Sequence, residues 1–146
     1  MREALKACIE SLALPDAAQA FLLDVWDLTQ VLDDWVDGDP VSRQEQDQAI
    51  WLALVRFPAQ PFLTAHQGVL TPVLASMVLK WKAADTVERL KLADQLPKAY
   101  VWRAGFYDVV LQVVLIVHGP EVAMAAAHEV LGMYGETFTA YRAEFN

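Results

Sequence analysis

The sequence predicts an all-α protein, a compact single domain of six to seven helices over residues 1–146. Three observations predict this fold. Helix start and stop signals recur along the chain, and the apolar residues between them follow the helical period. No two-residue turn with alternating flanks, the signal of a β-hairpin, occurs anywhere. A hydrophobic fraction of 55% over 146 residues is enough to bury a core and argues against disorder.

The expected elements of the first half are helices over residues 2–13, 16–37 and 43–55, followed by a loop at 57–61. Pro15 ends the first helix, and Asp16 is a plausible N-cap for the second. Gly38 ends the second helix, because glycine favours the position just past a helix C-terminus. Residues 42–45 (S-R-Q-E) have the pattern of a capping box, which opens the third helix.

The expected elements of the second half are helices over residues 72–84, 86–96, about 97–118, and 121–145. Thr71 followed by Pro72 predicts an N-cap with proline at the first helical position. The helix from Pro97 is apolar nearly all round beyond Phe106, so we expect it to be the buried central helix. Its single narrow polar spot contains Asp108.

The charge of the chain is concentrated in one segment. Between Lys6 and Arg43 there are eight acidic residues and no basic one, and the remaining 11 acidic residues are balanced by 11 Lys and Arg. Six of the eleven aspartates lie between Asp24 and Asp39. Like charges this close repel, so we expect a divalent cation, a basic partner or bulk water to face them.

The predicted helix over residues 16–37 has two distinct faces. The apolar arc, expected to be core, contains Phe21, Val25, Leu28, Leu32, Trp35 and Val36. The opposite half contains Asp24, Asp27, Gln30, Asp33, Asp34 and Asp37. Trp26 projects among these acids, which makes it a candidate anchor for a partner.

Two interpretations of the acidic half remain open. In the first, it binds a partner through Asp24, Trp26, Asp27, Gln30, Asp34 and Asp37. In the second, carboxylates one or two turns apart share Mg²⁺, which prefers oxygen ligands. The candidate metal ligands are Asp27, Asp33, Asp34 and Asp37, with Asp108 facing them from another helix.

Residues 33–37 (D-D-W-V-D) resemble the first aspartate-rich motif of all-α isoprenoid synthases, in which carboxylates hold Mg²⁺ against a diphosphate. The match covers five residues, and we carry no activity over from it. The D-x-x-D spacings at 24–27 and 34–37 are similar to the E-x-x-E and E-x-x-D pairs of all-α nucleotide pyrophosphohydrolases. The chain also resembles uncharacterised helical proteins of tailed bacteriophages, which combine a D-D-x-x-D-G-D helix with a W-R-x-G-x-Y-D helix, here residues 102–108.

The sequence thus favours an acidic, phage-encoded interaction protein that docks a basic surface of a host or viral protein. The alternative is a Mg²⁺-dependent hydrolase or binder of a phosphate-bearing small molecule. A pI near 4.7 argues against direct nucleic-acid binding. A single cysteine and the lack of a 20-residue apolar run lead us to expect a cytoplasmic protein without a membrane span. His66, His118 and His128 lack the spacing of a zinc site, and the oligomeric state is not predicted.

Overall fold

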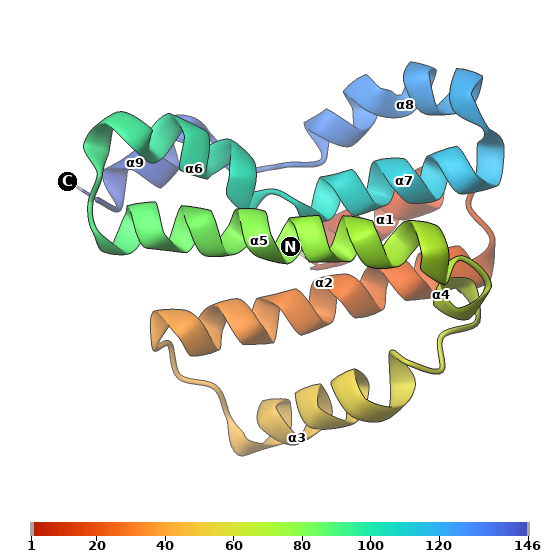
Figure 1. The fold of residues 1–146 in the computed structure, drawn as a ribbon, viewed down its shortest axis with the longest axis horizontal. Coiled ribbons are helices and arrows are strands. Elements are labelled where there is room, and N and C mark those ends of the chain that lie inside the picture. The colour runs from red at the N-terminus through yellow and green to blue at the C-terminus, as the bar shows by residue number, and fades with distance from the viewer. Residues whose placement is uncertain (1, 146) are drawn as a thin grey trace. The chain divides into compact units, whose positions relative to one another are not determined.

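The computed structural model describes residues 2–145, and every regular element in that range is helical, so the prediction of an all-α protein is confirmed (Figure 1). The elements are α1 (Arg2–Ser11), α2 (Asp16–Asp37), α3 (Arg43–Trp51), η1 (Leu52–Arg56), α4 (Pro61–Ala65), α5 (Gln67–Arg89), η2 (Ala93–Gln95), α6 (Leu96–Arg103), α7 (Phe106–His118), α8 (Pro120–Gly132) and α9 (Phe138–Ala143). We expected one domain, and the chain forms two compact units, one through Gln67 and the other from Gly68 onward.

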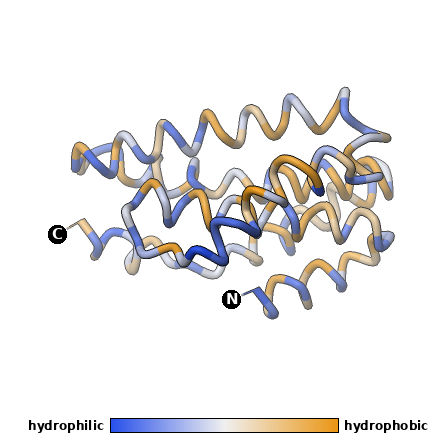
Figure 2. Tube along the Cα trace, turned by 90° about the horizontal axis from the view of Figure 1, so that it is seen from below, coloured by the Kyte–Doolittle hydropathy of each residue, from blue (hydrophilic) through white to orange (hydrophobic). Residues whose placement is uncertain are grey.

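The first unit is built around α2. This helix has the predicted bounds, and Gly38 follows it with a left-handed φ of 80°. Its first half buries Phe21, whose ring lies 5.8 Å from the rings of Phe57 and Phe62. Hydrophilic and hydrophobic positions alternate along α1 near the N-terminus, as an amphipathic helix requires (Figure 2).

The helix α3 begins at the predicted capping box. The Ser42 hydroxyl accepts a hydrogen bond from the Glu45 amide, and the Glu45 carboxylate accepts one from the Ser42 amide. The expected single helix over residues 43–55 instead changes at Leu52 into the π-helical turn η1, where the Phe57 amide donates to the Leu52 carbonyl at 2.8 Å. Single π turns of this kind are frequent at functional sites.

The second unit contains the predicted buried helix, in two pieces. The turn at Ala104 and Gly105 separates α6 from α7, and α7 buries Phe106, Val109, Val110, Val113 and Val114. A Cβ on Gly105 would lie 3.0 Å from Cγ of Met77, so α5 approaches this turn closely. The helices α7 and α8 form a hairpin through Gly119, which has a φ of 83°.

Three predicted boundaries in the second unit are wrong. The helix expected to start at Pro72 starts at Gln67, and Pro72 lies inside α5. The helix expected at 86–96 does not form, because α5 continues to Arg89 and the Thr86 hydroxyl donates to the Lys82 carbonyl. The helix expected over residues 121–145 instead ends at Gly132 as α8, and a separate helix, α9, follows, which the Thr137 hydroxyl caps by accepting from the Ala140 amide.

One segment, Ala93–His118, is long and apolar enough by composition to cross a membrane, with 33% of its most apolar window buried. Length and composition are weak evidence, since the core helix of a globular unit passes the same test. The segment contains η2, α6 and α7 with the turn at 104–105 between the last two.

Candidate functional site: the groove between α2 and α3

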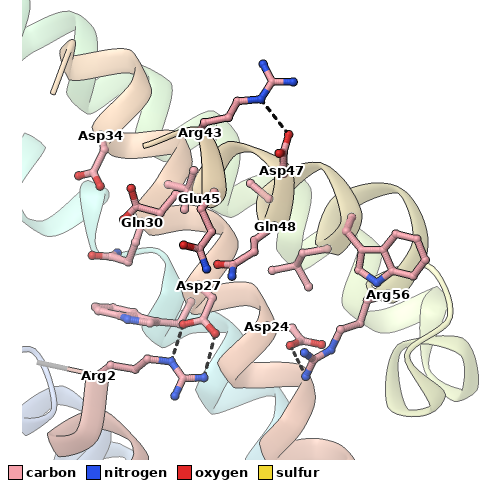
Figure 3. Close-up of a pocket in the computed structure, with 16 residues that line it drawn as sticks. Arg2, Asp24, Asp27, Gln30, Asp34, Arg43, Glu45, Asp47, Gln48 and Arg56 are labelled. Carbon is pink, nitrogen blue, oxygen red and sulfur yellow. Dashed lines mark hydrogen bonds and ion pairs between the residues drawn. The ribbon is translucent and has the colours of Figure 1, made fainter. Parts of the chain in front are cut away.

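The acidic helix α2 forms one wall of a groove of about 1180 Å³, and α3 with η1 forms the other (Figure 3). Of the predicted partner-binding residues, five line it, namely Asp24, Trp26, Asp27, Gln30 and Asp34. The wall from α3 and η1 contributes apolar groups, including Trp51 and Leu52, and several charged ones. The sequence favours a core position for Trp51, but this residue is 63% exposed, so that prediction is wrong.

Asp24 is the buried charge of this groove. It is 2% exposed, although the helical pattern assigned it to the open acidic half, so that assignment is wrong. Arg56 Nη2 lies 2.9 Å from one carboxylate oxygen, and the buried Gln60 amide donates to the other. Because both oxygens are satisfied from within the chain, Asp24 belongs to the fold of the groove and is not available to a partner.

Asp27 is held by the N-terminal helix. Arg2 donates from Nε to Oδ1 at 2.7 Å and from Nη2 to Oδ2 at 2.9 Å, a bidentate pair. The Asp27 carboxylate, by accepting these bonds, raises the pKa of Arg2 further above its already high value. A metal ion at Asp27 would have to displace this guanidinium.

The wall formed by α3 contains one ion pair and one carboxylate, Glu45, without an ion pair to any described residue. Arg43 Nε lies 3.3 Å from Asp47 Oδ1, one turn along α3. The capping hydrogen bonds from the Ser42 hydroxyl and amide lower the pKa of the Glu45 carboxyl. Five carboxylates and three guanidiniums line the groove, so its net charge is −2. Each guanidinium is paired with a carboxylate.

The C-terminal end of α2 differs from its beginning, because acidic and large apolar side chains are exposed there together. Asp34, Asp37 and Asp39 are exposed, and Asp33 is half-buried. Leu32, Trp35 and Val36 are 40%, 54% and 46% exposed, so the prediction that the whole apolar arc is core is wrong for this end. The fully buried residues of α2, by contrast, all lie in its first half, where Phe21 packs against Phe62 of α4.

The residues predicted to hold Mg²⁺ lie in different settings. Asp27 is paired with Arg2, and Asp34 lines the groove, whereas Asp33 and Asp37 are outside its lining. Asp108 lies in the second unit, where Lys80 donates to it. Across residues 2–145, no three His, Cys, Asp or Glu side chains are grouped so that they could hold a metal ion.

Comparison of the chain with protein-family models finds no match. Comparisons with curated proteins and with solved structures find no match either. The features of the chain that bear on its function are therefore the groove and the exposed end of α2.

Proposed function

We propose that this chain is a noncatalytic interaction protein that docks a basic surface of another protein through the C-terminal half of α2. One observation carries the proposal: the last turns of α2 and the residue that follows Gly38 combine four aspartates, at positions 33–39, with the exposed large apolar residues Leu32, Trp35 and Val36. Carboxylates steer a cationic partner, and exposed aromatic and aliphatic groups supply apolar area that can be buried on contact.

The division of α2 into two parts supports this proposal. In the first part, Asp24 and Asp27 are neutralised by Arg56 and Arg2, so their charge serves the fold. Toward the end, Asp34 is exposed, and the helix dipole adds negative potential there. A fold gains little stability from this arrangement, which is consistent with selection for an external cationic partner.

The resemblance to bacteriophage proteins, with its D-D-x-x-D-G-D helix, favours a partner from a bacterial host. The test is capture from a bacterial lysate by the wild type and by Asp34→Lys, followed by binding measurements with the purified partner. The matched control is Asp94→Lys, which makes the same change at an exposed acidic residue of η2 in the other unit. We expect a basic protein to be retained by the wild type and the control and lost with Asp34→Lys.

The association rate with that partner should fall at least tenfold between about 0.05 and 0.5 M salt, because the Debye length shortens from roughly 14 to 4 Å. If Asp34→Lys captures the same proteins as the wild type with unchanged affinity, the docking surface is elsewhere and the proposal fails.

The Mg²⁺-dependent site is the second candidate, and one observation favours it. Gln30 and Asp34 line the groove one turn apart, and Arg2 and Arg43, two cations that could pair with a phosphate, belong to the same lining. Such a site requires Arg2 to release Asp27 or Glu45 to leave its capping box. Both rearrangements break hydrogen bonds that the groove already makes.

A further inference from the structure

We infer that the occupant of the α2–α3 groove is a cationic amphipathic helix of the partner protein, laid along the two walls. This inference deepens the proposed docking function and depends on it. The partner would bind in the groove as well as at the exposed end of α2, and the segment of the partner that binds in the groove would be a helix.

The conformation follows from the walls. Both are helices, whose backbone N–H and C=O groups are bonded within each helix, so an extended peptide would find no main-chain partners there. A helix brings its own satisfied backbone and needs only side-chain contacts, as in other helix-in-groove complexes.

The amphipathic character follows from the lining. Trp26 and Val31 line the groove from α2, and Trp51 and Leu52 line it from the opposite wall, so together they supply apolar surface for one face of an incoming helix. Trp51 is 63% exposed, so a partner would bury most of it. Large aromatic side chains in such a position are the usual anchors of an interface.

The charge of the partner follows from the ion pairs. The three guanidiniums in the lining are already paired with Asp24, Asp27 and Asp47, and the two carboxylates that remain are Glu45 and Asp34. Figure 3 shows Asp34 and Glu45 on opposite walls of the groove. Lys or Arg on both flanks of the docked helix would meet one carboxylate on each side, whereas an acidic or neutral helix would leave the net charge of −2 unmatched.

The test uses a fluorescein-labelled 14-residue peptide with Leu at positions i, i+3, i+4 and i+7 and Lys on both flanks, read by fluorescence anisotropy. A second peptide of the same composition carries a central proline, which breaks the helix. We expect the helical peptide to bind at least tenfold more tightly than the broken one. Trp51→Ala and Asp34→Asn should each weaken binding at least fivefold.

Leu131→Ala and Asp94→Asn change an exposed apolar and an exposed acidic residue of the second unit and should leave binding unchanged. Circular dichroism of each variant confirms that the fold is intact. Sedimentation of the free protein with and without Trp51→Ala tests the competing occupant, a second copy of the chain. Self-association lost with Trp51→Ala would overturn the inference.

The failure of this inference is distinguishable from failure of the proposed function. If the two peptides bind equally and only Asp34→Asn weakens them, the partner is basic but is not a helix in the groove. If the helical peptide does not bind, or if Trp51→Ala leaves its affinity unchanged, the groove assignment is also overturned. The lysate capture with Asp34→Lys tests the docking function independently of either peptide.

Discussion

Arg2 and Asp27 form a bidentate ion pair that joins the first turn of α1 to the middle of α2, 25 residues apart in sequence. The two side chains are 49% and 35% exposed, so solvent screens much of their attraction. We predict that Arg2→Ala lowers the free energy of unfolding by about 0.5–1 kcal/mol. The effect should shrink in 1 M salt, as measured by urea unfolding at two ionic strengths.

Lys6→Ala is the control for this pair. Lys6 Nζ lies 3.9 Å from Glu10 Oε1 on the exposed surface of α1. This looser contact should contribute only a few tenths of a kcal/mol to the free energy of unfolding. Equal losses for Arg2→Ala and Lys6→Ala would show that the bidentate geometry has no measurable effect.

Asp24 should behave in the opposite way to a surface aspartate. Removing its carboxylate in Asp24→Ala leaves the buried Gln60 amide without its acceptor and Arg56 without its partner. We predict a loss of about 2–4 kcal/mol in the free energy of unfolding, from urea denaturation. A loss below about 0.5 kcal/mol, typical of a surface substitution, would contradict the buried hydrogen-bonded role.

Asp34→Asn is the matched change on the same helix. Asp34 is exposed and lies in the last turn of α2, where the macrodipole disfavours negative charge. We predict a gain of about 0.3–1 kcal/mol in the free energy of unfolding by the same denaturation. Destabilisation would mean that the Asp34 carboxylate serves the fold, and its charge would then need no partner to explain it.

The contrast between Asp24 and Asp34 also shows what the sequence could predict. Local signals located α2 correctly, because Pro15 and Gly38 impose its ends whatever surrounds it. The helical period separated polar from apolar positions, but it could not identify which turns other elements cover. The turn that contains Asp24 is covered because Gln60, 36 residues away, and Arg56 of η1 contact the Asp24 carboxylate.

The same limit explains the error about Pro72. Pro72 has the sequence pattern of a helix start, yet five residues before it are already helical. A local pattern shows that proline is tolerated near a helix start, but not how many residues precede it.

Two tyrosines of the second unit, Tyr134 and Tyr141, should make the protein sensitive to alkali. Burial, and a hydrogen bond to Glu88, raise the pKa of the Tyr141 hydroxyl, and burial with a bond to Glu136 raises that of Tyr134. Since the folded chain holds these protons more tightly than the unfolded chain, the stability is fully present below the ordinary tyrosine pKa of about 10. The stability that these two protonated tyrosines contribute is lost as the pH rises above 10 toward their pKa values in the folded chain.

We therefore predict that the thermal midpoint falls steeply between about pH 10 and 12. Tyr141→Phe should lower the midpoint at pH 7, because it removes the hydrogen bond to Glu88, and should flatten the decline above pH 10. The measurement is differential scanning fluorimetry across this range, with Arg142→Lys as a conservative exposed control that keeps the charge. A decline that is equally steep in Tyr141→Phe would exclude this tyrosine as the titrating group.

The last prediction decides between docking and Mg²⁺ chemistry. Asp27 is held by Arg2, and Asp108 by Lys80, so an ion would compete with existing pairs at two of the proposed ligands. We predict that 10 mM Mg²⁺ or Mn²⁺ shifts the thermal midpoint by less than about 1 °C relative to NaCl of equal ionic strength. The shift should be the same in Asp34→Asn. A native site filled a hundredfold above its Kd would instead add about 2.7 kcal/mol, or several degrees for a chain of this size. A gain of that size in the wild type that disappears in Asp34→Asn would make the Mg²⁺ site the leading function, with the groove as its substrate pocket.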